Sequence, residues 1–279
     1  MKKKTIPEEE TSFQIMMKAV LLGITPDDYA EFHAMVNGII GDDDADGRVN
    51  DTSNGYALSS RDDRRHIQAP SHGMEDASEK TLTLRVQMQD VTKPPMWREL
   101  RIPADFTFFQ LHQAIQVACG FEDAHLWQFQ RKAYNPELQI GIPADHTDPD
   151  ELGLEEWTHD ARTTGITAFL AEKGQKLVYV YDFGDDWIFT VSVVDITPRD
   201  GETAECTRWK SDMQPLEDCG GTWGYMNMRS AWSQRDSLTK RQKKELADTL
   251  GYNSFDELEE VIIDSQFDLK VVNEILAEI

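Results

Sequence analysis

The sequence predicts an α+β protein. Residues 81–89 alternate strictly between apolar and polar side chains, which is typical of a strand with one buried face. Residues 107–119 repeat apolar side chains at three- and four-residue spacings, which is typical of a helix. From residue 79 the elements follow in the order strand, strand, helix, strand. This order predicts a β-grasp-like mixed sheet packed with helices, with further helices toward both ends of the chain.

Ahead of the sheet, residues 1–40 are expected to form an N-terminal helical segment. Apolar side chains in residues 11–40 recur at helical spacing on both sides of Pro26, so a hairpin of two short helices is predicted. Residues 41–78 are rich in Asp, Ser, Gly and Asn and have few large apolar side chains, which indicates a flexible acidic and polar linker. The α+β domain is therefore expected to occupy residues 79–279.

Turn-forming residues divide this domain into its elements. Pro94-Pro95 separates the first two strands, and Gly120 suits the C-terminal cap of the first helix. Residues 133–163 form an insert rich in Asp, Glu and Pro, and the chain from Thr197 to Trp223 is expected to be irregular. Strands are predicted at residues 81–89, 96–102, 126–131, 176–181 and 187–196. Helices are predicted at residues 107–119, 165–170, 223–232, 239–250, 255–265 and 269–279.

The linker contains a segment that resembles part of a calcium-binding loop. Asp42, Asp44 and Asp46 stand at its first, third and fifth positions, and Gly47 stands at the sixth. The twelfth position is Ser53, where such loops carry a bidentate carboxylate. A solvated acidic linker is therefore the preferred interpretation, and calcium binding by the three aspartates is the weaker one.

Charge limits the class of partner. The chain has 28 Lys and Arg against 51 Asp and Glu, which gives a formal net charge of −23. Affinity for nucleic acid comes mainly from cationic side chains that displace counterions from phosphates, so nucleic acid is an unfavourable partner. The cationic run at residues 240–244 is interpreted as the solvated face of a helix. A protein or peptide is the expected partner.

The apolar stretches, the N-terminal residues and the cysteines indicate the cellular compartment of the protein. The apolar stretches are far shorter than the ~20 residues needed to cross a bilayer, so no membrane association is expected. The acidic run at residues 8–10 interrupts the N-terminal lysines before any apolar run, unlike a secretory leader. The three cysteines cannot all pair with one another. A cytoplasmic protein with reduced thiols is therefore predicted.

Two short segments combine aromatic rings, carboxylates and glycines: Tyr181-Asp-Phe-Gly-Asp-Asp-Trp187 and Asp218-Cys-Gly-Gly-Thr-Trp-Gly-Tyr225. The glycines allow turns that other residues resist, and the carboxylates need water, a cation or a hydrogen-bond donor. We expect the two turns to lie side by side on the sheet and to form a recognition surface. The predicted surface residues are His125, Tyr181, Asp182, Asp185, Asp186, Trp187, Asp218, Cys219, Trp223 and Tyr225.

Both segments also have a structural interpretation, in which the aspartates accept backbone N–H bonds and the rings pack. In a third interpretation the carboxylates bind a divalent cation or act as a base, or Cys219 is a nucleophile with a lowered pKa. A nucleophilic thiol needs a histidine base, which would have to be His112, His125, His146 or His159. Zinc is disfavoured because the chain has no Cys-x-x-Cys and no His-x-x-x-His. No catalytic residue and no cofactor is predicted.

A series of motifs makes the chain similar to a known family. The motifs are Pro94–Pro103, Leu111–Ile115, Gly120–Leu126, the two aromatic segments, the second of which is preceded by Pro215-Leu-Glu, and Phe267–Asn273. In this order, over residues 80–279, they resemble the plasmid pRiA4b ORF-3-like family. The resemblance implies an α+β domain with a mixed sheet and implies no known reaction. Members of that family occur on plasmids and beside transposable elements.

The chain departs from the pattern of that family at two positions. Trp127 and Phe189 stand where the family commonly has histidines, so aromatic rings replace two potential metal ligands. The favoured function is therefore a non-enzymatic module that binds a protein or peptide, with a link to plasmid or transposable-element biology. One alternative is a metal- or thiol-dependent enzyme that uses residues 182–186 and Cys219. The other is a DNA-associated regulator of transposition, against which the charge argues.

Overall fold

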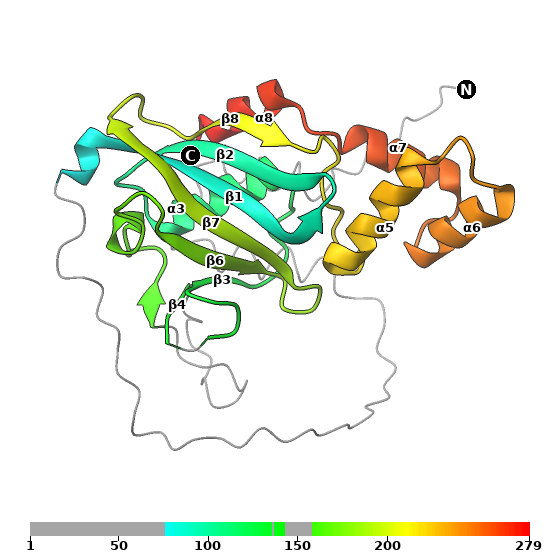
Figure 1. Cartoon of the computed structure of the whole chain (residues 1–279), viewed down its shortest axis with the longest axis horizontal. Coiled ribbons are helices and arrows are strands. Elements are labelled where there is room, and N and C mark those ends of the chain that lie inside the picture. The colour runs from blue at the N-terminus through cyan, green and yellow to red at the C-terminus, as the bar shows by residue number, and fades with distance from the viewer. Residues whose placement is uncertain (1–75, 136, 143–157) are drawn as a thin grey trace, which may run out of the picture.

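Eight strands form one mixed sheet in the part of the chain that the structure describes (Figure 1). The structure is a computed structural model, and it describes residues 76–135, 137–142 and 158–279. The predicted N-terminal hairpin, the linker with its calcium-like segment, and His146 lie outside these residues. The strand order is β5-β4-β3-β6-β7-β1-β2-β8. Neighbouring strands are antiparallel except for β4 and β5, which are parallel. The predicted α+β class with a mixed sheet is confirmed.

The elements follow the predicted order with additions. The strands are β1 (Lys80–Thr92), β2 (Pro95–Pro103), β3 (Trp127–Gln130), β4 (Gln139–Gly141), β5 (His159–Asp160), β6 (Lys176–Tyr181), β7 (Trp187–Pro198) and β8 (Glu205–Lys210). The helices are α3 (Phe108–Cys119), α5 (Gly221–Ser233), α6 (Lys240–Thr249), α7 (Phe255–Asp264) and α8 (Leu269–Leu276), with short 3-10 turns η2 (Ala77–Glu79) and η3 (Ile166–Ala168). Among the described helices, none has the length and apolar character that a membrane crossing requires.

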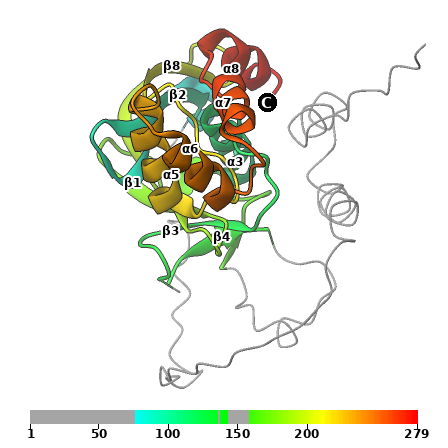
Figure 2. The same cartoon turned by 90° about the vertical axis from the view of Figure 1, so that its right-hand side faces the viewer.

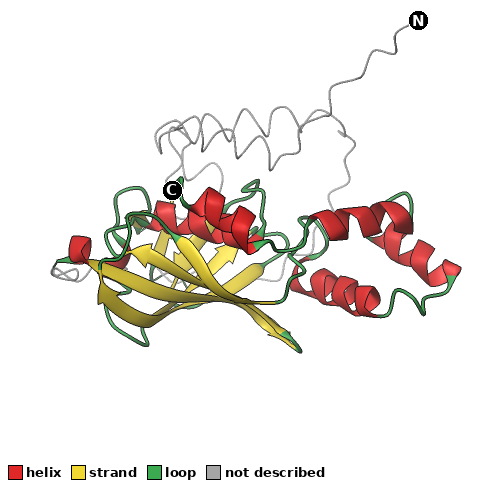
Figure 3. Ribbon diagram, turned by 90° about the horizontal axis from the view of Figure 1, so that it is seen from above, coloured by secondary structure: helices red, strands yellow, loops and turns green. Residues whose placement is uncertain are grey.

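The core lies between the sheet and the helices on one of its faces (Figure 3). The alternating side chains of β1 (Leu82, Leu84, Val86 and Met88) are fully buried. Helix α3 begins at a capping box, in which the Thr107 side chain accepts from Gln110 N and the Gln110 side chain accepts from Thr107 N. It ends at Gly120, whose left-handed φ of 76° suits glycine. Local signals therefore fix both ends of the helix that covers the sheet.

Helices α5, α6 and α7 gather at one end of the sheet, and they stand in front of it in Figure 2. Helix α8 then returns to pack beside α3 and β8. On α8, Asn273 uses its side chain to pair with both backbone groups of Cys206, accepting from N at 2.7 Å and donating to O at 3.0 Å. The free edge of β8 is thereby partly covered, which limits pairing with another chain.

One prediction about the sheet is wrong, and the strand pairing could not be predicted from the sequence. The chain from Thr197 to Trp223 was expected to be irregular, but it contains β8, which pairs with β2 at the edge of the sheet. An edge strand buries few side chains, so β8 lacks the alternation that reveals a half-buried strand. The strand after the first helix, β3, pairs with β4 and β6, whereas β1 lies between β2 and β7. The insert at residues 133–163 supplies β4 and β5, which are too short to leave a pattern.

Candidate functional site

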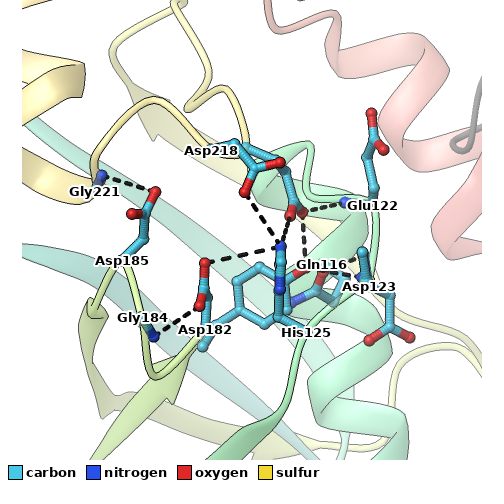
Figure 4. Close-up of polar contacts among 12 residues, drawn as sticks. Gln116, Glu122, Asp123, His125, Asp182, Gly184, Asp185, Asp218 and Gly221 are labelled. Atoms are coloured by element: carbon cyan, nitrogen blue, oxygen red, sulfur yellow. Dashed lines mark hydrogen bonds and ion pairs between the residues drawn. The ribbon is translucent and has the colours of Figure 1, made fainter. Parts of the chain in front are cut away.

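Two turns that are far apart in the sequence lie side by side at the candidate site (Figure 4). One is the β6–β7 turn, residues 182–186, and the other is the α5 loop, residues 217–221, which leads into α5. The Asp185 Oδ2 atom accepts from Gly220 N at 3.1 Å and from Gly221 N at 2.9 Å. Gly220 is the N-cap residue of α5 and has no side chain to cap it, so Asp185 provides the cap from another element. The expected adjacency of the two turns is confirmed.

The close approach of the turns explains one glycine of the second aromatic segment. A Cβ on Gly221 would lie 2.0 Å from the carbonyl oxygen of Asp185, and its φ of 62° is left-handed. Any larger residue at this position would push the two turns apart. Backbone geometry, and not solubility, therefore requires the glycine.

The aromatic residues at the ends of the two segments lie beneath the turns. Tyr181, Trp187 and Tyr225 are fully buried, so they support the site and do not offer a surface to a partner. The Tyr181 hydroxyl accepts from Ala124 N at 3.0 Å and donates to Glu217 Oε1 at 2.7 Å. Burial raises the pKa of Tyr181 well above its usual range, so this hydroxyl stays a donor.

The turns carry a group that we name the acidic cluster: His125, Asp182, Glu217 and Asp218. His125 Nε2 lies 3.1 Å from Glu217 Oε2, 3.8 Å from Asp182 Oδ2 and 3.8 Å from Asp218 Oδ1. In Figure 4 the carboxyl groups of Asp182 and Asp218 point toward the His125 ring. Asp182 is only 8% exposed, whereas the side chain of Asp218 is 83% exposed. The cluster therefore extends from the interior to the surface.

Glu217 is a site residue that the sequence analysis missed. Its Oε1 atom accepts from Glu122 N at 2.7 Å and from the Tyr181 hydroxyl at 2.7 Å. Burial raises its pKa from 4.5 to about 7, although both hydrogen bonds favour the charged form. The residue directly precedes Asp218, but no local signal distinguishes a buried glutamate from a solvated one.

Left-handed backbone positions shape both turns. Asp182, Asp186 and Asp218 have φ values of 55°, 54° and 57°. Aspartate tolerates this region better than most residues because its short side chain can bond to the nearby backbone. Asp182 does so, since its Oδ1 atom accepts from Gly184 N at 2.8 Å. Asp186 is exposed and its N–H donates to Asp182 O at 2.8 Å, so its role in the turn is structural.

The Cys219 thiol, His112 and His159 are not arranged for nucleophilic chemistry. Burial, followed by the negative charge of Asp185, raises the pKa of Cys219 to about 12, so the thiol is protonated at neutral pH. His112 bonds to the Tyr179 hydroxyl and to Asp123 Oδ1, both at 2.8 Å, within the core. His159 lies on β5, with its ring against Phe169. His125 is the candidate base that reaches the two turns.

Exposed apolar side chains accompany the acidic cluster. Trp223, in the first turn of α5, is 68% exposed. Leu126, next to His125, is 54% exposed, and its carbonyl oxygen accepts from Asp182 N at 2.9 Å. Met226, one turn after Trp223, is 38% exposed. We name Leu126, Trp223 and Met226 the apolar rim. In contrast, Trp127 and Phe189 are buried in the core.

Comparison with known proteins places the chain in a family. A model described as plasmid pRiA4b ORF-3-like protein matches residues 80–264. The chain belongs to the plasmid pRiA4b ORF-3-like family. It is 27% identical over 146 residues to the uncharacterized protein y4hQ of Sinorhizobium fredii (strain NBRC 101917 / NGR234), a match that covers 51% of this chain and 68% of y4hQ.

A solved structure supports the same assignment. The protein of unknown function MM3350 from Methanosarcina mazei Go1 is 30% identical to this chain, with a TM-score of 0.50. The match covers 70% of this chain and 97% of MM3350. Neither relative has a described activity, so the comparisons establish family and fold while the function has to be argued from the site.

Proposed function

We propose that this family member is a non-enzymatic module that binds a protein or peptide segment carrying both basic and apolar side chains. The observation that supports this most is Trp223, which is 68% exposed in the first turn of α5, directly after the loop that holds Asp218. Tryptophan contributes strongly to protein interfaces because its large ring buries much apolar surface at little cost in conformational entropy.

Charge complementarity selects the chemistry of the partner. Asp218 is exposed in the loop that leads into α5, the helix that carries Trp223, and the whole chain has a formal net charge of −23. Such a field attracts cationic partners and disfavours acidic ones. A Lys or Arg side chain could pair with Asp218 and lie over the Trp223 ring, a contact worth about 0.5–1 kcal/mol at an exposed site.

The hydrogen bonds that connect the two turns favour a binding surface of fixed shape. The Asp185 carboxylate joins the β6–β7 turn to the start of α5, and Tyr181 fixes Glu217 from beneath. A surface whose shape is already set loses less conformational entropy when a partner binds. The plasmid setting named in the family description motivates a partner encoded by, or acting on, a mobile element.

The two alternative functions receive less support from the described residues. A thiol-dependent enzyme needs a thiolate, and the raised pKa of Cys219 opposes one. A DNA-associated regulator needs free cations. On α6, however, Arg241 pairs with Glu245 at 2.7 Å and Lys244 pairs with Asp248 at 2.6 Å. These internal pairs reduce the charge that α6 offers to phosphates.

A peptide array tests the proposal. Arrayed peptides that combine Lys or Arg with Leu or Phe should bind the chain, whereas peptides with Glu in place of the basic residues should not. The best peptide is then measured by fluorescence polarisation in buffer containing EDTA. Trp223→Ala should weaken binding by about tenfold or more.

The control is Trp209→Ala, because Trp209 is 37% exposed on β8 and far from the turns in the sheet order. This variant should bind the peptide as the unchanged chain does. If Asp185→Ala combined with Trp223→Ala leaves peptide affinity unchanged, the assigned surface is wrong.

A further inference from the structure

One carboxylate oxygen in the acidic cluster, Glu217 Oε2, is buried without a hydrogen-bond donor among the described residues. Asp182 is 8% exposed, and its Oδ1 atom accepts from Gly184 N, whereas its Oδ2 atom faces His125 Nε2 at 3.8 Å, beyond hydrogen-bond distance. Glu217 Oε2 is fully buried and accepts no hydrogen bond from the described residues. His125 Nε2 lies 3.1 Å from it, but without hydrogen-bond geometry. Buried carboxylate oxygens are costly unless a donor or a cation compensates them.

Three side chains of the cluster bring one potential ligand atom each close together. One ligand atom from each of His125, Asp182 and Asp218 lies within 4.8 Å of the others. The His125 Nε2 atom is 3.1–3.8 Å from the carboxylate oxygens of the cluster. In a tetrahedral zinc site with bonds of about 2.1 Å, neighbouring ligand atoms are about 3.4 Å apart. The distances from His125 Nε2 to the carboxylate oxygens bracket this value.

We propose that the acidic cluster binds one first-row divalent cation of the zinc type. Its ligands are His125 Nε2 and carboxylate oxygens of Asp182 and Asp218, and Glu217 Oε2 lies beside His125 Nε2. Imidazole nitrogen among carboxylates suits zinc and its neighbours, whereas calcium and magnesium prefer oxygen ligands alone. The inference is independent of the proposed peptide binding, because the cation binds the chain without a partner.

The ligand residues are positioned by parts of the fold that do not depend on the cation. Asp182 is fixed by Gly184 N, and the neighbouring Glu217 is fixed by Tyr181 and Glu122 N. Asp218 is the exposed ligand, so its side chain can rotate inward without disturbing the core. As ligands, the ionised carboxylates of Asp182 and Asp218 would carry a charge of −2, which one divalent cation neutralises.

Isothermal titration of the full-length, untagged chain with Zn²⁺ after EDTA treatment tests the inference. The unchanged chain should bind one equivalent saturably at this site. His125→Ala and Asp218→Asn should each weaken that binding by about tenfold or more. Asp218→Asn is the safer variant for folding because the residue is exposed, and circular dichroism confirms that each variant is folded.

Asp186→Asn is the matched control, since Asp186 belongs to the same turn, is exposed and lies outside the cluster. It should bind Zn²⁺ as the unchanged chain does. The inference is overturned if Zn²⁺ does not bind saturably, or if folded His125→Ala and Asp218→Asn bind it as tightly as the control. Peptide binding measured in EDTA distinguishes the two proposals: if it persists while Zn²⁺ does not bind, the cation inference fails and the recognition proposal stands.

Discussion

Replacing Glu217 by glutamine isolates the energetic effect of one buried carboxyl group. Gln keeps an Oε1 acceptor for Glu122 N and the Tyr181 hydroxyl, but it cannot ionise. In the folded chain the pKa of Glu217 is raised from 4.5 to about 7 by burial. At about 1.4 kcal/mol per pKa unit, ionisation of the folded state costs about 3 kcal/mol more than ionisation of the unfolded state.

The sign of the pH dependence follows from proton binding. Between pH 4.5 and about 7 the folded state holds this proton more tightly than the unfolded state does. Stability therefore falls as pH rises through this range. The contribution of the neutral carboxyl is fully present below pH 4.5 and is lost as pH passes about 7. Relative to Glu217→Gln, the unchanged chain should lose about 2–3 kcal/mol of unfolding free energy between pH 5 and pH 8, because part of the full effect is already lost at pH 5.

Urea unfolding of both proteins in EDTA, at half-unit pH steps, measures this difference, provided that the denaturant slopes agree. Asp218→Asn is the control, because it removes an exposed carboxylate from the same cluster and leaves Glu217 in place. It should retain most of the pH dependence. A difference between the unchanged chain and Glu217→Gln that stays constant from pH 5 to pH 8 would refute the assignment of a raised pKa to this residue.

Three further outcomes are expected. Gly221→Ala should lower the unfolding free energy by about 2–4 kcal/mol, because the added Cβ would meet the Asp185 carbonyl. The control is Gly174→Ala, which has a left-handed φ but no neighbour within 4 Å and should cost only about 1 kcal/mol. Equal losses in the two variants would contradict the close approach of the turns. Leu84→Ala, at a fully buried position, should cost about 2–5 kcal/mol in urea unfolding, whereas Val194→Ala, at 39% exposure, should cost far less; similar costs would contradict the assigned core. Cys219 should react slowly with a thiol reagent at pH 7.5 in the folded chain and rapidly after unfolding in guanidinium, and a fast reaction of one thiol in the folded chain would restore the thiol alternative.

Local patterns predicted the parts of the fold that local physics determines. The alternation of β1 arises because one face of the strand is buried. The end of α3 was predicted because Gly120, a glycine suited to a C-terminal cap, directly follows the helix. The hairpin of β6 and β7 was predicted because its residues are neighbours in the sequence. Strand β8 was missed because most of its side chains remain in solvent at the sheet edge.

The candidate site was predicted only in part, for a related reason. The two turns could be found because their glycines and aspartates are unusual where they stand. Glu217 could not, since its burial depends on Tyr181 and Glu122, which come from other elements. Tyr181, Trp187 and Tyr225 were placed on the recognition surface, yet tertiary packing buries them completely. Composition identifies an aromatic segment without telling which of its rings face solvent.

The cap that Asp185 provides to α5 limits how this domain can be recombined during evolution. The helix start depends on a residue 35 positions earlier in the chain, in a different structural element. A C-terminal helical segment exchanged from another family member would lose its first amide partners unless the matching β6–β7 turn came with it. The two aromatic segments are therefore expected to be inherited together, as a single unit, even though residues 188–217 separate them.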